Sequence, residues 1–201
     1  KSNRGCDPWW ETEGEWHRSW KNEFPVEWQE IIHIASTGER HIADVKTETG
    51  WVIEFQSSYL KPEERRSRNE FYDKLIWVVD GCRRPTDVKQ FNRILEEGST
   101  RIVDKPYTIR VNFPDECRLI NEWGSSDKLV FFDFYSGNKT GQKFLWLLYP
   151  QLPSGNVYIS RIKSCAFVET SNGNGFEKLF QEVIFPMYQE ILPLYEHHKR
   201  H

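Results

Sequence analysis

Residues 40–58 read RHIADVKTETGWVIEFQSS and combine two strand-like apolar runs with two carboxylates and an amide. Asp44 interrupts the first run, and Glu54 and Gln56 interrupt the second. Burying a charge without a partner costs roughly several kcal/mol or more. We therefore expect each carboxylate to have a partner, either a bound cation or a cationic side chain.

The spacing of the two runs predicts a hairpin that gathers these polar groups. Side chains alternate between the faces of a strand, so Asp44 and Glu54 share a face only if the loop between the strands has an odd length. A three-residue loop over 48–50 meets this condition and ends on a glycine, which suits the left-handed last position of such a loop. The hairpin then places Asp44 opposite Glu54 and Ile42 opposite Gln56.

Two carboxylates and an amide oxygen on one face are a suitable donor set for a hard divalent cation. Mg²⁺ and Mn²⁺ bind such oxygen clusters through few protein ligands and several waters. The alternative is a salt-bridged pair of strands in which Arg40 or Lys46 neutralises the carboxylates. The spacing alone is compatible with both interpretations.

Local patterns predict an α/β chain. The first half is expected to hold a helix, three strands, a second helix beginning near Pro62, a buried strand and a third helix closed by Gly98. The expected ranges are 11–21, 29–36, 41–46, 51–57, 60–74, 75–80 and 87–97. Short strands are expected over 107–113, 129–135, 143–149 and 157–163, and a last helix from Gly175 towards His197 that Pro186 and Pro193 kink or break.

Composition limits the class of protein. The chain has 201 residues, 38% of them hydrophobic and 28% charged, which is typical of a globular domain. Its net charge of -3 excludes a basic footprint over the whole surface, so any contact with nucleic acid must be local. The basic clusters are either such a contact or ordinary solvated surface, and they comprise Lys61, Arg65, Arg66 and Arg68, then Arg83, Arg84 and Lys89.

The chain is expected to be cytoplasmic and reduced. Its four cysteines show no CxxC spacing and so predict no zinc site among themselves, and no signal peptide is recognised. The longest apolar runs, 75–79 and 144–149, are far too short to span a membrane.

Asp44 followed ten residues later by Glu54-Phe55-Gln56 resembles the Asp…(Asp/Glu)-x-Lys signature of the PD-(D/E)XK nuclease superfamily. The chain is more specifically similar to the competence protein CoiA-like nuclease family. The motifs that carry this resemblance are Ala43-Asp44-Val45, Ile53-Glu54-Phe55-Gln56-x-Ser58, Arg68-x-x-Phe71-Tyr72 and Ile76-Trp77, with a Glu-x-x-x-His helix upstream. Together they cover about residues 6 to 81.

The resemblance implies a restriction-endonuclease-like core with the order αβββαβ and a mixed sheet over residues 1–104. Residues 105–201 would form a β-rich C-terminal extension with a terminal helix. The implied activity is Mg²⁺- or Mn²⁺-dependent hydrolysis of DNA phosphodiester bonds, in DNA uptake, recombination or defence. Asp44 and Glu54 would hold the cation with the carbonyl of Phe55. Gln56 stands where the superfamily has lysine, and because an amide cannot act as a base, it would orient water or ligate through its oxygen.

The first expected helix offers groups that could replace the missing lysine. Glu13, His17 and Lys21 are spaced by four residues and therefore share a helix face. Our hypothesis is that Glu13 joins the metal site while His17 or Lys21 faces the scissile phosphate. The alternative is a structural helix in which Trp16 and Trp20 pack in the core and His17 satisfies a local hydrogen bond.

Further residues are expected to contact DNA or to support the site. Arg68 and Tyr72 lie one helical turn apart and either contact phosphate or brace the strand of Glu54. We favour phosphate contact for Arg68, together with Lys61 and Arg65, and bracing for Tyr72. Asp133 alternates with aromatic residues and is interpreted as structural.

Two other functions remain open: a catalytically silent DNA-binding or scaffolding module that retains the nuclease fold, and a partner-binding domain that contacts no nucleic acid. Cleavage of both strands of a duplex would require a homodimer or a protein partner.

Overall fold

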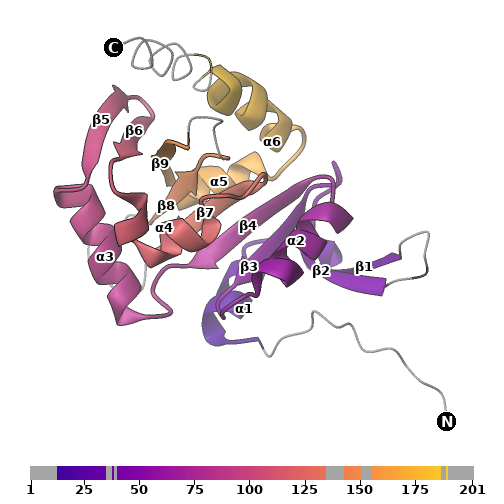
Figure 1. The fold of residues 1–201 in the computed structure, drawn as a ribbon. Coiled ribbons are helices and arrows are strands. Elements are labelled where there is room, and N and C mark those ends of the chain that lie inside the picture. Colours follow the sequence, from indigo (N-terminus) through magenta and orange to yellow (C-terminus); the bar gives the residue numbers. More distant parts are fainter. Residues whose placement is uncertain are drawn as a thin grey trace.

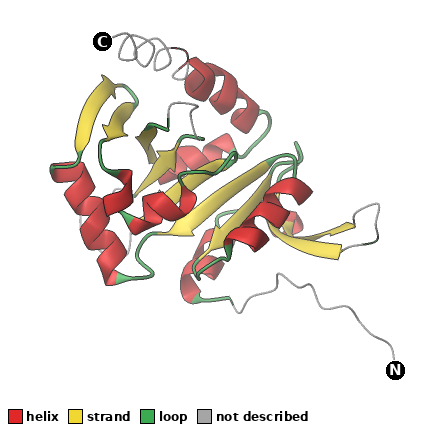
Figure 2. Cartoon of the chain, viewed as in Figure 1, coloured by secondary structure: helices red, strands yellow, loops and turns green. Residues whose placement is uncertain are grey.

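The computed structural model describes residues 13–34, 38, 40–134, 143–150, 155–186 and 189. These residues form a mixed α/β protein with six α-helices and one mixed sheet of nine strands, as Figures 1 and 2 show. The helices are α1 Glu15–Lys21, α2 Pro62–Phe71, α3 Pro85–Glu96, α4 Arg118–Trp123, α5 Ser164–Thr170 and α6 Gly175–Lys178. The strands are β1 Gln29–Ile34, β2 Arg40–Lys46, β3 Val52–Gln56, β4 Leu75–Asp80, β5 Ser99–Asp104, β6 Tyr107–Val111, β7 Leu129–Asp133, β8 Phe144–Leu148 and β9 Val157–Lys163. The expected α/β class is confirmed.

The sheet has the strand order β1-β2-β3-β4-β7-β8-β9-β6-β5. Strand β4 pairs in parallel with β3 and with β7, and the other pairs are antiparallel. A strand with parallel neighbours on both sides is normally covered on both faces, which explains the continuous apolar run of 75–79. Those five residues are all buried, so the predicted buried strand is confirmed.

Helices cover both faces of the sheet. On β3, Ile53 and Phe55 belong to the core cluster that also holds Trp20 of α1, Phe167 of α5 and Phe176 of α6. Val52 belongs to the opposite cluster, with Phe91 of α3 and the α4 residues Leu119 and Trp123. Fully burying one such side chain contributes about 1.5–3 kcal/mol, so each helix is held mainly by its apolar face. Strand β3 therefore contributes to both core clusters, with α1 packed on the face of Ile53 and Phe55.

The predicted loop of the β2–β3 hairpin is confirmed. Thr47 donates its backbone N–H to the Trp51 carbonyl at 2.8 Å, which closes a loop over 48–50. Gly50 has a φ of 84°, the left-handed conformation expected at the last loop position. The paired residues of the two strands are Lys46 with Val52 and Val45 with Ile53.

The next position of the hairpin is unusual. Instead of a further ladder bond, a side-chain oxygen of Asp44, Oδ2, accepts the backbone N–H of Phe55 at 2.8 Å. The register of the two strands ends at Val45 with Ile53, so the predicted pairs Asp44–Glu54 and Ile42–Gln56 are not among the paired residues of β2 and β3. The carboxylate of Asp44 is therefore fixed by the backbone of β3.

Three elements were not expected from local patterns: β5, α4 and α5. The expected division after residue 104 falls within the β5–β6 hairpin, and one sheet passes through both predicted parts. After α6, residues Leu179–Ile184 form a π-helix, and the predicted continuation from residue 190 lies outside the described residues. Among the helices that are described, none is both long and apolar enough to cross a membrane.

Candidate metal centre

Glu13, His17 and Lys21 come together as expected, although α1 begins only at Glu15, so Glu13 precedes the Gly14 N-cap and is not part of the helix. Lys21 Nζ lies 2.5 Å from Glu13 Oε1, and His17 Nε2 lies 3.9 Å from the same oxygen. His17 and Lys21 are 9% and 4% exposed, so their polar ends are held inside the protein. These side chains bring together one carboxylate, one imidazole and one ammonium group.

Next to this polar face, Trp16 and Trp20 of α1 pack in the core, as the structural interpretation of the helix required. The ring of Trp20 stacks on Phe55 with a centroid distance of 5.9 Å, and Trp16 meets the same ring edge-on at 6.4 Å. Both indole N–H groups donate to Asp133 Oδ2 at 2.9 Å. The structural and the site interpretations of the helix are compatible, because the packing of Trp16 and Trp20 fixes α1 and so positions the polar side chains next to them.

Asp44 meets the polar face of α1. His17 Nε2 lies 3.0 Å from Asp44 Oδ1, yet this buried nitrogen has no partner in hydrogen-bonding geometry among the described residues. One ligand atom each from Glu13, His17 and Asp44 all lie within 4.8 Å of one another.

These dimensions suit a divalent cation. Ligands at about 2.1 Å from a shared octahedral cation are about 3 Å apart at right angles and about 4.2 Å apart across it. The 3.0 Å separation of His17 Nε2 and Asp44 Oδ1 matches the first of these distances. The group therefore has the donor atoms and the size to hold a metal ion.

Glu54 is not part of this group. Its side chain faces Arg68 of α2, whose Nη1 lies 3.1 Å from Glu54 Oε2. Burial first, and then repulsion by the Asp44 carboxylate, raise the pKa of Glu54 well above its usual value, although Arg68 and the Asp44 backbone N–H oppose the shift. Its second oxygen, Oε1, is buried and has no hydrogen-bond partner among the described residues. The two carboxylates of the hairpin thus have different surroundings.

Lys21 lies beside the group but is held by two acids. Its Nζ donates to Glu13 and to Glu30, the latter at 2.7 Å. Burial alone would lower the pKa of Lys21, but the hydrogen bonds and charges of these two glutamates outweigh it, so the pKa is raised. Lys21 is therefore an ammonium ion and cannot act as a general base in this arrangement.

Gln56 and Phe55 lie at the end of β3. The Gln56 side-chain amide donates to Ser58 Oγ at 3.0 Å, which fixes its orientation near the end of the strand. Phe55 contributes its backbone N–H to Asp44 and its ring to α1. Among the described contacts, none joins the Phe55 carbonyl to the group of Glu13, His17 and Asp44.

The predicted DNA contacts divide into buried and exposed residues. Arg68 is 5% exposed and also donates to Glu64 at 2.6 Å, so binding of a phosphate to it would disrupt a buried ion pair. Tyr72 is 3% exposed and lies against His33. Arg65 lies over the Trp123 ring at 5.0 Å. Lys61 is exposed at the N-cap of α2.

Sequence reasoning missed the partners of Asp133, and for Arg68 it favoured phosphate contact over the bracing of the Glu54 strand that the structure shows. The structural interpretation of Asp133 agrees with its two indole hydrogen bonds. The available signal was the Trp16–Trp20 spacing of four, which places both indoles on one side of a helix. Pairing of Glu54 with Arg68 had no local signal, because 14 residues and a change of element separate them.

Comparison of this chain with protein-family models, with curated proteins and with solved structures finds no match in any of the three. Arguments about function therefore rest on the geometry of the site and on the motifs of the chain.

Proposed function

We propose that this chain is a Mg²⁺- or Mn²⁺-dependent nuclease that hydrolyses DNA phosphodiester bonds. The observation that carries the proposal is the cluster of Glu13, His17 and Asp44, whose donor atoms lie within 4.8 Å of one another. The resemblance to the CoiA-like branch of the PD-(D/E)XK nucleases supports the same reaction, with DNA uptake, recombination or defence as the setting.

The order of elements supports a restriction-endonuclease-like core. Helix α1, strands β1 to β3, helix α2 and strand β4 follow one another, and β3 and β4 are parallel neighbours. This is the order αβββαβ that the resemblance implies. Asp44 and Glu54 lie on its second and third strands, at the positions of the superfamily signature.

Each residue of the cluster has a role in this proposal. The backbone N–H of Phe55 holds the Asp44 carboxylate in place, so this ligand requires little reordering on binding. His17 of α1 and Glu13, just before this helix, complete the donor set. A bound cation would acidify a water molecule and stabilise the charge that develops on the phosphate. The ammonium group of Lys21, held beside Glu13, would add positive charge at the same place.

The donor set favours Mn²⁺ over Mg²⁺. Mg²⁺ prefers oxygen ligands and near-ideal octahedral geometry, whereas imidazole is a common ligand for the later divalent metals. Because His17 would supply a nitrogen, we expect the higher activity with Mn²⁺.

The test is a cleavage time course on supercoiled, linear and single-stranded DNA with Mn²⁺, Mg²⁺ or EDTA. Asp44→Asn keeps the size of the side chain and should abolish metal-dependent cleavage. Glu15→Gln is a matched control, because Glu15 is an exposed acid of the same helix outside the cluster. Full activity of Asp44→Asn, or of both His17→Ala and Lys21→Ala, would refute these roles.

A second candidate is a DNA-binding or scaffolding module that retains this fold without cleaving. The pairing of Glu54 with Arg68 favours it, since the arginine already neutralises one carboxylate of the signature. DNA binding that is insensitive to metal, without cleavage on any substrate, would support this candidate. In either case DNA is the proposed partner, and cleavage of both strands would need a homodimer or a second protein.

A further inference from the structure

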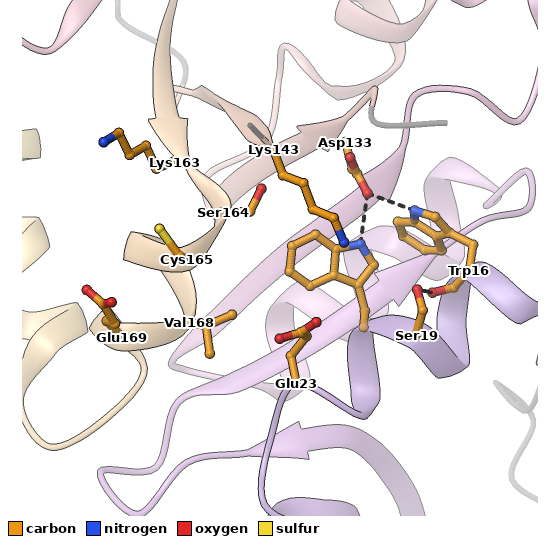
Figure 3. Close-up of a pocket in the computed structure, with 11 residues that line it drawn as sticks. Trp16, Ser19, Glu23, Asp133, Lys143, Lys163, Ser164, Cys165, Val168 and Glu169 are labelled. Atoms are coloured by element: carbon orange, nitrogen blue, oxygen red, sulfur yellow. Dashed lines mark hydrogen bonds between the residues drawn. The ribbon is translucent and has the colours of Figure 1, made fainter. Parts of the chain in front are cut away.

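A cavity of about 530 Å³ lies beside α1, along the side that carries Trp16 and Trp20. Its walls come from α1, from the ends of β7, β8 and β9, and from α5 (Figure 3). Ligand sites of small molecules commonly measure about 300–1,000 Å³ and combine apolar walls with a few polar groups. The cavity therefore has the size of a small-molecule or nucleotide site.

Aromatic side chains form one wall of this cavity. Trp16 and Trp20 both line it, and their indole N–H groups are taken up by Asp133 Oδ2. These bonds fix the orientation of both rings and consume their only donors. Trp20 is only 7% exposed and stacks on Phe55, so the partly buried Trp16 offers most of the carbon surface to a ligand, which suits a flat aromatic group such as a nucleobase.

Charged groups occupy two other parts of the lining. Lys143 and Lys163 come from the strand side, where Phe144 pairs with Lys163 and Ser164 donates its N–H to the Lys143 carbonyl. Glu23 lies just after α1, and Glu169 lies in the last turn of α5. Figure 3 shows Lys143 extending from the strands toward α1, with the two glutamates lower in the view.

This lining matches the groups of a nucleotide. A lysine ammonium binds phosphate as a point charge, whereas a carboxylate accepts hydrogen bonds from the exocyclic amino group of a base such as cytosine. The aromatic wall would stack on the base itself. A simple anion would use only the lysines, and an apolar ligand would use only the indoles.

The cavity is also coupled to the candidate metal centre. Trp16 of the cavity and His17 of the cluster are consecutive residues, and both rings pack against Phe55, at 6.4 and 5.8 Å between centroids. One nucleotide held in the cavity would thus place the adjoining backbone near the polar face of α1.

We propose that this cavity binds one unpaired nucleotide of a DNA strand, with the base on the indole wall and a phosphate at Lys143. This inference rests on the proposed nuclease function and deepens it, because it predicts a preference for single-stranded or splayed DNA. A base carrying an amino group should bind better than thymine.

Cys165 provides a readout that needs neither metal nor cleavage. Its thiol is exposed, forms no disulfide and lines the cavity. Occupation of the cavity should slow its alkylation by a maleimide, followed for this residue by peptide mass spectrometry in EDTA. The ligands are dCMP, dTMP, deoxycytidine, inorganic phosphate, a single-stranded oligonucleotide and a blunt duplex.

Protection should be strongest with the single-stranded oligonucleotide, weaker with dCMP and weaker again with dTMP. Free mononucleotides that protect better than the oligonucleotide would point to a free-nucleotide site and overturn the DNA assignment. Protection by phosphate equal to that by dCMP, or by the duplex equal to that by the single strand, would also overturn it.

Matched variants test the lining. Ser19→Trp should fill the cavity from an exposed position of α1 and remove the protection, whereas Ser19→Ala leaves the space open and should keep it. Lys143→Met should weaken the binding of dCMP about tenfold or more, with little change in the binding of deoxycytidine. Equal protection in Ser19→Trp and Ser19→Ala would refute binding in the cavity.

The results also separate the two proposals. Cleavage by the wild type without any protection of Cys165 overturns the cavity site and leaves the nuclease standing. Protection without cleavage on any DNA supports the cavity site while the nuclease proposal fails. If both hold, Ser19→Trp should reduce cleavage of single-stranded DNA more than that of duplex DNA.

Discussion

Asp44 and Glu54 belong to one hairpin but have opposite surroundings. Asp44 is held by a backbone N–H and lies against His17 of α1, whereas Glu54 is buried against Arg68 of α2. The first carboxylate lies within 4.8 Å of two other potential ligand groups, and the second already has a cationic partner inside the protein. Under the proposed function, neighbouring members of one motif would serve binding and structure separately.

Removal of Arg68 should have the largest effect on stability. Arg68→Met leaves Glu54 buried without its cation, and breaking such a buried pair typically costs about 3–5 kcal/mol. The free energy of unfolding, measured by urea denaturation, should fall by this amount. The double variant Arg68→Met with Glu54→Gln should recover a large part of the loss, since no uncompensated charge remains.

An exposed ion pair provides the control for this comparison. Arg93→Met removes a partner of Glu97 and Glu116 that is 66% exposed, and should cost less than about 1 kcal/mol. Equal losses for Arg68→Met and Arg93→Met would show that the Glu54 pair is not a buried brace.

Cation binding should distinguish Asp44 from Glu54. Mn²⁺ at about 100 times its dissociation constant should stabilise the protein by about 2.7 kcal/mol. For a chain of this size that corresponds to a rise in Tm of roughly 5–11 °C, measured by thermal unfolding. Asp44→Asn should remove the rise, and Glu54→Gln should retain most of it.

The reverse pattern would move the site to the other face of β3. Loss of the Mn²⁺ response in Glu54→Gln but not in Asp44→Asn would mean that the cation displaces Arg68. His17→Gln serves as a further check. If the imidazole is a ligand, its removal should weaken the binding of Mn²⁺ more than the binding of Mg²⁺.

The sequence predicted those features that depend on local chemistry. The loop at 48–50 required an odd length and a glycine, and the buried strand 75–79 required apolar side chains on both faces. The placement of His17 and Lys21 on one face of α1 likewise follows from helix geometry, whereas Glu13 precedes the helix.

Features that depend on distant packing could not be predicted. Helix α5 has only seven residues, and its Phe167 is buried against Phe131 and Trp20, which are far away in the sequence. The Lys21–Glu30 contact occurs where Glu30 adopts a φ of 53°, a conformation that no residue pattern announces for a glutamate. Such short helices and backbone irregularities are set by the surrounding tertiary structure.

The smallest predicted effect is a difference in the pH dependence of stability. Because the pKa of Glu54 is raised in the folded protein, the folded state binds more protons than the unfolded state between about pH 4.3 and the raised value. Stability should therefore fall as the pH rises through this window, by at most about 1.4 kcal/mol per pH unit, and level off above it. Glu54→Gln should lack this component of the slope.

The comparison is made on the metal-free protein by urea denaturation at several pH values. Asp80 and Asp87 also have raised pKa values because of burial, but both variants contain them, so the difference between the two curves isolates Glu54. As the pH rises from acidic values, where Glu54 is protonated, the stability of the wild type should fall relative to that of Glu54→Gln. Parallel curves would mean that Arg68 fully compensates the buried charge, and that the two carboxylates of the hairpin differ less than their surroundings indicate.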